Sequence, residues 1–296
     1  MATPALSRRH AAGAVSARGL LFTVLGEFVL PTGGSAWTSA FIETFGRLGV
    51  EEKAIRQALA RTAADGWIKP ERHGRRTRWW LTPDGNRLLT EGTERIYAFA
   101  GSQRQWDGSW LLVLARVPEN DRAARHVLRT RLSWAGLGSP APGIWITTHT
   151  ERSEEVEQVL RQAGIADGQI FAAEHRGGGQ LSALVAEAWD LPAIEQEYEA
   201  FLADFQAAAT SDPLTRLIEL VHAWRRFPSI DPGLPAGLLP SRWSGARAAQ
   251  LFAARHAKWS ADAVTEWARL NQPRGHPQAR TATPQTSGSG RHRSAV

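Results

Sequence analysis

Residues 38–81 read TSAFIETFGRLGVEEKAIRQALARTAADGWIKPERHGRRTRWWL and combine two helical patterns with a hairpin pattern. Thr38 or Ser39 can cap the first helix, in which apolar residues recur at helical spacing until Gly49. A second helix is predicted over 51–65. Two helices joined by so short a glycine-containing turn are typical of a helix-turn-helix.

The residues on either side of this pair predict a winged form of the motif. A helix over 16–30 is predicted before it, stopped by Pro31, and a short extended piece leads to Trp37. After it, residues 67–81 predict a hairpin with a polar turn, and Thr82-Pro83 is suited to open a further helix. The order helix, strand, helix, helix, hairpin, helix is that of a winged helix-turn-helix.

The middle of the chain has a different pattern, in which strands and helices alternate. The predicted order is strand 110–117, helix 122–134, strand 144–147, helix 151–163 and strand 169–173. This alternation predicts a small ferredoxin-like α/β unit. Its charges balance at 10 basic against 11 acidic residues over 91–180, so we expect this unit to make protein contacts.

The last third is predicted to be helical, with helices over 193–209, 214–227 and 245–259. The expected fold class is therefore α+β and multi-domain. The expected parts are a flexible leader 1–15, a winged helix-turn-helix DNA-binding domain 16–98, a ferredoxin-like α/β dimerisation unit 106–176, a helical C-terminal domain 181–271 and a disordered basic tail 272–296.

Composition excludes several classes of protein. The chain of 296 residues has no cysteine, which rules out disulfides, thiolate metal sites and cysteine nucleophiles. Its net charge is +6, and residues 1–90 carry 13 basic against 7 acidic side chains. A basic first third is expected of a part that binds a polyanion. No apolar run approaches the ~20 residues of a membrane span, so we expect a cytoplasmic protein without membrane association.

The second helix of the pair carries the candidate base-reading residues. Ile55, Ala58, Leu59 and Thr62 are predicted to face inward. The outward stripe is then Lys53, Gln57, Ala60 and Ala64, flanked by Arg56 and Arg61. In a helix-turn-helix this outward face enters the major groove, where Gln pairs with adenine and Arg with guanine.

The hairpin adds Arg72, Arg75, Arg76 and Arg78, which suit phosphate or minor-groove contacts. Trp79 and Trp80 are adjacent, so one is expected to face the core and the other the open side of the wing. The simpler alternative is a solvated surface in an arginine-rich protein.

Motifs of catalysis are missing from the sequence. It contains no HExxH, GxSxG, P-loop or GxGxxG pattern. Gly177-Gly178-Gly179 is interpreted as a hinge between units, and His175 as a surface histidine. His222, His256 and His276 lack metal-ligand spacing, so no metal site and no catalytic residue is predicted.

Long ordered blocks of the chain resemble the PaaX family of bacterial transcriptional repressors. The blocks are ARGLLFTVLGEFV at 17–29, LGVEEKAIRQALARTAADGWI at 48–68, GRRTRWWLTPDG at 74–85, WDGSWLLVLARVPENDRAARHVLRTRLSWAGLGSPAPGIWIT at 106–147, AWDL at 188–191 and RRFPSIDPGLPAGLLPSRWSGARAAQLF at 225–252. The resemblance implies a winged-helix DNA reader, a middle dimerisation unit and a C-terminal helical domain. It also implies a homodimer that represses an aromatic-acid (phenylacetate-type) catabolic operon on a double-stranded DNA operator, and no enzyme activity.

The same resemblance implies a small-molecule effector and assigns residues by position. Repression would be relieved by an acyl-CoA such as phenylacetyl-CoA, with no other cofactor. Lys53, Arg56, Gln57 and Arg61 would lie on the recognition helix, and Arg75, Arg76 and Arg78 on the wing. The effector block would be His222, Arg225, Arg226, Phe227, Asp231 and Trp243. Arg225 and Arg226 could bind CoA phosphates, or pair with carboxylates instead.

The middle unit also resembles small CRISPR-associated ferredoxin-like nucleases, which bind metal with an acidic residue after the first strand. Here Arg116 stands at that position. A cation would repel the metal, so nuclease activity is not expected.

Two other functions remain as alternatives. An enzyme acting on nucleic acid or acyl-CoA would show turnover that depends on added metal or on His175 or His222. A non-specific architectural DNA-binding protein would show no preferred operator and no response to a small molecule.

Overall fold

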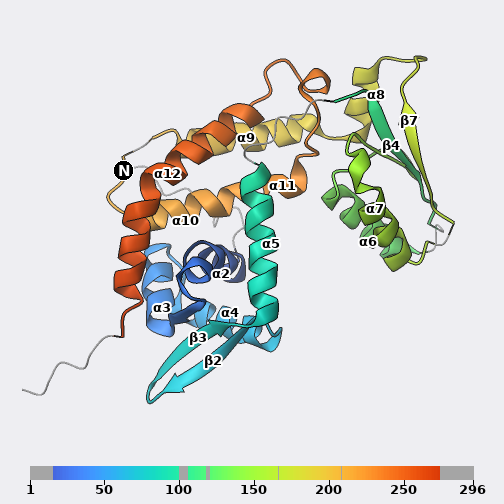
Figure 1. The fold of residues 1–296 in the computed structure, drawn as a ribbon. Coiled ribbons are helices and arrows are strands. Elements are labelled where there is room, and N and C mark those ends of the chain that lie inside the picture. The colour runs from blue at the N-terminus through green and yellow to red at the C-terminus, as the bar shows by residue number, and fades with distance from the viewer. Residues whose placement is uncertain (1–15, 100–105, 118–120, 166, 208, 274–296) are drawn as a thin grey trace, which may run out of the picture.

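The computed structural model describes residues 16–99, 106–117, 121–165, 167–207 and 209–273. The predicted leader 1–15, most of the predicted tail 272–296 and part of the predicted linker around 101–108 lie outside the described residues. Figure 1 shows the described chain as three parts, with the winged helix at the bottom, a group of long helices above it and an α/β unit at one side.

The winged helix has the predicted element order. It consists of α2 (Ala17–Val24), the π-helical η1 (Leu25–Val29), η2 (Leu30–Thr32), β1 (Ser35–Trp37), α3 (Thr38–Arg47), α4 (Glu52–Ala64), β2 (Ile68–His73), β3 (Arg76–Leu81) and α5 (Pro83–Phe99). The strands form an antiparallel sheet in the order β1-β3-β2. Thr82 caps α5 through a hydrogen bond from the Gly85 N–H, as predicted from the Thr-Pro pair.

Two local predictions in this part were wrong. The first helix is not α-helical as far as Pro31. Pro31 cannot continue an α-helix, because it has no N–H and its ring conflicts with the carbonyl four residues earlier. Before Pro31 the helix changes to the wider π-helical form, in which the Leu30 N–H donates to Leu25 O. Thr38 does not cap α3, because its hydroxyl donates to Thr77 O of β3.

The middle unit consists of β4 (Ser109–Leu114), α6 (Arg122–Trp134), β5 (Gly138–Ala141), β6 (Ile144–Thr147), η3 (Thr150–Arg152), α7 (Ser153–Gln162) and β7 (Gln169–Glu174). The sheet order is β5-β6-β4-β7 with antiparallel neighbours throughout, which is the ferredoxin-like arrangement for this chain order. The sequence did not predict β5, because Gly138 and Pro140 are poor strand formers. Helices α6 and α7 cover one face of the sheet. The middle unit has a separate hydrophobic core, which includes Leu111, Val113 and Leu128.

The last third consists of α8 (Leu181–Ala188), α9 (Leu191–Phe205), α10 (Pro213–Trp224), α11 (Phe227–Ile230), η4 (Ala236–Leu238) and α12 (Gly245–Leu270). Asp190 and Asp212 cap α9 and α10, and a proline follows each within two residues, which explains why both helices begin earlier than predicted. The predicted end of α12 at Trp259 was wrong, because Ala263, Trp267 and Leu270 continue its buried face.

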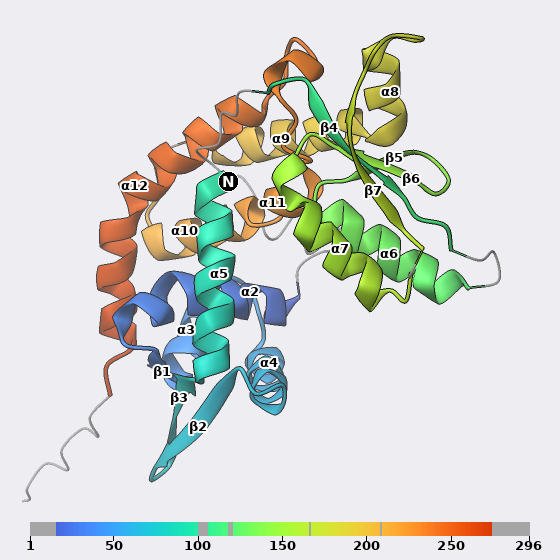
Figure 2. The ribbon, with the colours of Figure 1, turned by 45° about the vertical axis from the view of Figure 1, so that its right-hand side comes forward.

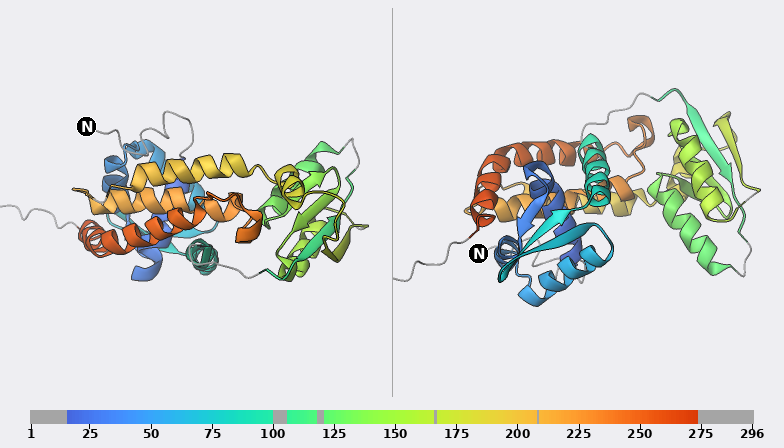
Figure 3. Two further views of the ribbon diagram at one scale, coloured as in Figure 1. Left: turned by 90° about the horizontal axis from the view of Figure 1, so that it is seen from above. Right: turned by 60° about the horizontal axis from the view of Figure 1, so that its bottom comes forward.

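The winged helix and the C-terminal helices share one hydrophobic core. A single buried cluster joins residues of α2, α3 and α4 to residues of α9, α10 and α12. Trp267 lies at the boundary, with its ring 5.5 Å from that of Phe28 and 5.6 Å from that of Phe41. The rotated views in Figures 2 and 3 show α10 and α12 lying directly along the winged helix, with the middle unit to one side.

Candidate nucleic-acid interface

The outward face of α4 is arranged as its sequence predicts. Ile55, Ala58, Leu59 and Thr62 are buried, and Lys53, Arg56, Gln57, Ala60, Arg61 and Ala64 are exposed. A shallow hollow along the exposed face is lined by Glu52, Lys53, Arg56, Gln57 and Ala60. The two alanines keep the stripe narrow, which suits a helix that enters a groove.

The cations on α4 are not equivalent. The Arg56 guanidinium lies 2.6 Å from the Glu52 carboxylate one turn earlier. Lys53 and Arg61 have no such carboxylate among the described residues. Glu52 contacts Arg56 through Nε and Nη2, so a phosphate or guanine that binds both of these groups would have to replace Glu52. Exposed pairs of this kind contribute little to stability, so the exchange costs little.

Three of the four wing arginines are exposed: Arg72 on β2, and Arg75 and Arg76 at the tip. Strands β2 and β3 pair Arg72 with Thr77 and His73 with Arg76, and Gly74 takes the positive φ of 62° that the turn requires. Arg75 and Arg76 are exposed, and no carboxylate among the described residues pairs with them.

Arg78 does not belong to this exposed set. Its guanidinium lies 4.6 Å from the Trp80 ring centroid and 5.7 Å from that of Trp37. Its Nε is buried and has no hydrogen-bond partner among the described residues. The Arg78 guanidinium is therefore packed against the rings of Trp80 and Trp37, whereas Arg75 and Arg76 are exposed. Trp79 packs on the core and donates to Thr38 Oγ1, so the two tryptophans divide as predicted.

A small hollow brings α3, α4 and the wing tip together. Its volume is about 180 Å³. It is lined by Trp37, Thr38, Ser39, Ile42, Arg56, Arg75, Arg76 and Thr77. The first turn of α3 has no side-chain cap, so its N–H groups add to the positive potential of the three arginines. This combination suits a phosphate of the DNA backbone.

Sequence reasoning missed the contribution of α3 to this hollow. Local spacing indicates Thr38 and Ser39 only as caps, although their position at a helix N-terminus next to an arginine-rich hairpin is a signal for anion binding. The pairing Trp37↔Arg78 between β1 and β3, which brings the two segments together, cannot be inferred from local periodicity.

The residues expected around an effector separate into two groups. His222 and Arg225, at the end of α10, contact α2: His222 Nδ1 lies 3.0 Å from Thr23 Oγ1, and Arg225 donates to Gly19 O at 2.6 Å. Burial lowers the pKa of Arg225. This group joins the C-terminal helices to the winged helix.

The second group surrounds Tyr198. Its ring stacks on Phe227 at 4.2 Å and lies edge-on to Trp243 at 5.6 Å, and its hydroxyl donates to Asp231 at 2.6 Å. Burial raises the pKa of the Asp231 carboxyl. Arg226 belongs to neither group. Its guanidinium pairs with the Glu197 carboxylate at 2.8 Å, which is the alternative to phosphate binding that the sequence left open.

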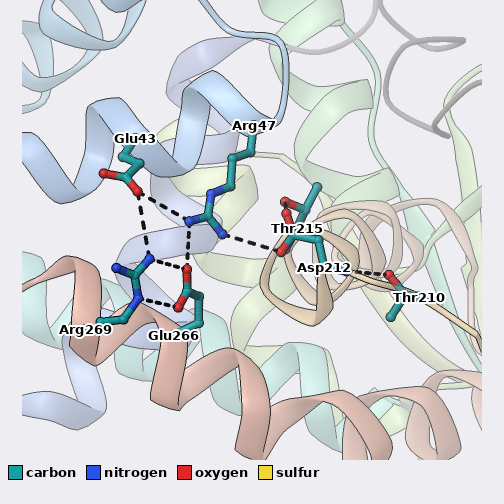
Figure 4. Close-up of polar contacts among 7 residues, drawn as sticks. All are labelled: Glu43, Arg47, Thr210, Asp212, Thr215, Glu266 and Arg269. Atoms are coloured by element: carbon teal, nitrogen blue, oxygen red, sulfur yellow. Dashed lines mark hydrogen bonds and ion pairs between the residues drawn. The ribbon is translucent and has the colours of Figure 1, made fainter.

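An ion network fixes α3 against the C-terminal helices. Figure 4 shows Arg47 of α3 directed between Glu43, Glu266 of α12 and the capping Asp212 of α10. Its guanidinium lies 2.7 Å from Glu266 and 3.7 Å from Asp212, and Arg269 also pairs with Glu266 at 2.7 Å. The winged helix is therefore held at a defined orientation on the C-terminal helices.

The end of α12 makes a further contact with the sheet of the winged helix. The Trp37 N–H donates to Asn271 Oδ1 at 2.9 Å, and Asn271 Nδ2 donates to Ser35 O. These bonds satisfy backbone groups of the edge strand β1 with a side chain from the other end of the chain.

The network predicts a pH-dependent contribution to stability. Hydrogen bonds from Arg269 and Arg47 lower the pKa of Glu266 from 4.5 to about 2. A lowered folded-state pKa stabilises the folded protein above pH ~4.5, and the contribution is lost as the pH falls toward 2. After solvent screening, Glu266→Gln is expected to cost about 1 kcal/mol at pH 7.

Urea denaturation of both proteins from pH 7 to pH 3 measures this difference. The two free energies of unfolding should converge as the pH falls. Asp262→Asn serves as the control, because it removes the same charge from an exposed position one turn earlier on α12, outside the network. A difference for Glu266→Gln that is constant with pH would contradict the assignment.

No group of three or more His, Asp or Glu side chains in the described ranges is placed to hold a metal ion. No helix in that part of the chain is long and apolar enough to cross a membrane. Arg116 is exposed just after β4.

Comparisons with known proteins cover the same three parts. Residues 16–85 match the family model described as PaaX-like protein, residues 103–185 match the PaaX protein central Cas2-like domain, and residues 189–269 match the PaaX-like protein C-terminal domain. The solved structure of the uncharacterized protein Rv0674 from Mycobacterium tuberculosis has a similar fold, with a TM-score of 0.54 and 23% identity over 86% of this chain and 97% of that chain.

A relative of established function is also similar over most of the chain. The transcriptional repressor PaaX of Escherichia coli (strain K12) is 32% identical over 260 residues, which cover 82% of this chain and 81% of the relative. This family consists of transcriptional regulators and not of enzymes. The chain belongs to the PaaX family of transcriptional repressors.

Proposed function

We propose that this protein is a dimeric cytoplasmic repressor that reads an operator with the outward face of α4 and holds the DNA backbone with its wing. The observation that carries this proposal is the hollow in which Arg56, Arg75 and Arg76 meet the N-terminus of α3. A phosphate there would fix the register of α4 in the major groove, because phosphate contacts position a protein and base contacts specify the sequence.

Two winged heads on one dimer would bind a palindromic operator. The half-sites of such an operator are separated by whole helical turns, about 10–10.5 base pairs each, because both heads must face the same side of the duplex. A non-specific architectural protein would instead bind shuffled DNA as tightly as the operator.

Gln57 is the residue proposed to read a base. Gln57→Ala should reduce discrimination at one position in each half-site by about 1–3 kcal/mol, because the bidentate contact to adenine is lost. Competition with operators that are changed at single positions measures this effect. Ala64→Ser, at the far end of the same exposed stripe, is the control. An unchanged base preference for Gln57→Ala would remove Gln57 from the readout.

The proposed effector is an acyl-CoA of the aryl type, such as phenylacetyl-CoA, and the proposed target is an aromatic-acid catabolic operon. The family resemblance supports both. For relief of repression, the thioester must bind the DNA-free form more tightly, by the same factor by which it weakens DNA binding. Of the residues suggested for it, Arg225 already donates to Gly19 O, and Phe227 is buried against Tyr198. The half-buried Trp243 and the exposed Arg226 are the members left to contact the thioester.

A panel of CoA thioesters tests the effector. Fluorescence anisotropy of operator DNA is measured with free CoA, acetyl-CoA and aryl-acyl-CoA thioesters. Loss of binding with an aryl thioester alone would support the proposal. If the protein binds the operator equally tightly in the presence of each compound, the proposed CoA effector is wrong. The proposed DNA binding by the winged helix would not be affected by that result.

A further inference from the structure

The charges of the middle unit are separated between its two helices. Helix α6 contains four arginines, one histidine and no acidic residue, whereas α7 contains three glutamates and one arginine. The balanced charge of residues 91–180, from which protein contacts were expected, therefore includes one basic helix and one acidic helix. The surface of α6 is suited to a polyanion.

Three basic side chains of α6 form a row on one side of the helix. Arg122, His126 and Arg129 are exposed and are separated by four and three residues, a spacing that places them on one side of an α-helix. We refer to these three residues, which extend over about 10 Å of the helix axis, as the α6 row. Arg131, nine residues after Arg122 and so on the opposite side, donates to Gln162 of α7. The α6 row therefore faces away from the acidic helix.

The fold itself does not account for the α6 row. Arg122 and Arg129 have no carboxylate partner among the described residues, whereas Arg161 of α7 pairs with Glu157 at 2.7 Å. Arg122 also stands in the first turn of α6, where the helix dipole favours acidic residues and where none follows the capping Asp121. Side chains that oppose such a local preference are expected where a ligand binds.

Helix α6 lies on the same side of the molecule as the outward face of α4. In the right-hand view of Figure 3, α4 and α6 both lie along the lower border, with the rest of the winged helix above α4 and with α7 above α6. The outward face of α4 and the α6 row are therefore turned toward the same border. Figures 1 and 2 show the wing tip and α6 on opposite sides of α4. Arg95 of α5 donates to Trp134 O at 2.6 Å, which holds the end of α6 next to the winged helix.

We propose that the α6 row is a second contact to duplex DNA, which binds the backbone beside the half-site, on the side of α4 opposite the wing. This inference rests on the proposed reading of DNA by α4 and adds a surface outside the winged helix. Duplex DNA carries one negative charge per about 1.7 Å of its axis, so a row of about 10 Å meets several phosphates. Phosphate contacts carry no sequence information, so the α6 row adds affinity without adding base preference.

The length of the DNA tests this contact. One duplex contains a half-site alone, and a second extends it by about 15 base pairs on each side, which is about one and a half helical turns. The double variant Arg122→Ala with Arg129→Ala should bind the short duplex as tightly as the wild type. It should bind the extended duplex about 30-fold more weakly at 0.15 M salt, with a salt slope lower by about two units, because two phosphate contacts are lost.

The matched control removes two arginines that are paired with carboxylates in the same unit. Arg161 pairs with Glu157, and Arg176 pairs with Glu174. The double alanine variant of Arg161 and Arg176 lowers the net charge equally and should bind both duplexes as the wild type does. Any binding of the extended DNA by the second head of a dimer is common to both variants, so the difference between them reports on the α6 row.

Three results would overturn the proposal. These are equal losses in the two double variants, a loss for the Arg122 and Arg129 variant that is the same on both duplexes, and no loss on the extended duplex. If that variant kept its DNA affinity but no longer responded to a CoA thioester, the α6 row would bind phosphates of the effector instead.

The same titrations separate this inference from the proposed function. A wild type that binds the half-site no more tightly than shuffled DNA would contradict reading by α4. A wild type that prefers the half-site, together with an Arg122 and Arg129 variant that binds the extended duplex equally well, would contradict the α6 contact alone.

Discussion

Replacing Arg75 and Arg76 with alanine is expected to weaken binding to every DNA sequence by about 30-fold at 0.15 M salt. Each phosphate contact contributes a slope of about −0.9 in a plot of log K against log salt, which corresponds to about fivefold in affinity at that salt concentration. Both side chains are exposed at the wing tip and line the hollow with Arg56. The salt slope should therefore fall by about two units, with the base preference unchanged.

The matched control removes two charges at the opposite end of the molecule. Arg242 and Arg247 are exposed near the start of α12, which Figure 1 shows far from the wing. Their double alanine variant lowers the net charge equally and should leave the salt slope unchanged. Anisotropy titrations from 50 to 400 mM salt compare the two variants. Equal losses in both would mean that net charge, and not the wing, determines DNA binding.

Trp267→Ala is expected to lower the free energy of unfolding by about 3–5 kcal/mol, because it empties a buried site between the two parts of the core. The side chain is 1% exposed and contacts Phe28 and Phe41 of the winged helix. Its Nε1 has no hydrogen-bond partner among the described residues, so the cost comes from lost packing. DNA binding should fail at a lower temperature, although Trp267 lies outside the proposed interface.

Urea denaturation followed by far-ultraviolet circular dichroism measures this loss. Val264→Ala, 41% exposed on the same helix, is the control and should change stability by less than about 0.5 kcal/mol. A loss below 1 kcal/mol for Trp267→Ala would contradict the shared core. A separate transition for the winged helix would contradict it as well.

Local patterns predicted the elements that carry the candidate site. The spacing of Ile55, Ala58, Leu59 and Thr62 defines the inward face of α4, and so its outward face, without any tertiary information. The predicted bounds of α6 and β6 also agree with the structure, because a capping aspartate precedes the helix and β-branched and aromatic residues form the strand.

Contacts between distant segments were not predictable from these patterns. The bonds between Asn271 and the strand β1 join residues more than 230 positions apart. The end of α12 was missed for the same reason, because Trp267 is buried by α3 and η1 and not by its own helix. The suggested effector block was a run in sequence. Its members diverge where the chain turns between α10 and α11, toward Gly19 on one side and Tyr198 on the other.

The shared core and the ion network connect the winged helix to the C-terminal helices. Arg47 contacts α10 and α12 from α3, the helix that precedes α4. A ligand that shifts α10 would therefore also shift the orientation of the winged helix. This is the physical route by which the proposed effector would act on the operator contact.

The most direct measurement of the central claim compares two DNAs at physiological salt. Anisotropy titrations use DNA from upstream of this protein's own and neighbouring genes, and the same DNA with its sequence shuffled. Binding to one upstream fragment should be at least 10³-fold tighter than binding to its shuffled copy, as in specific repressors. Equal affinity for both DNAs would contradict sequence-specific reading by α4.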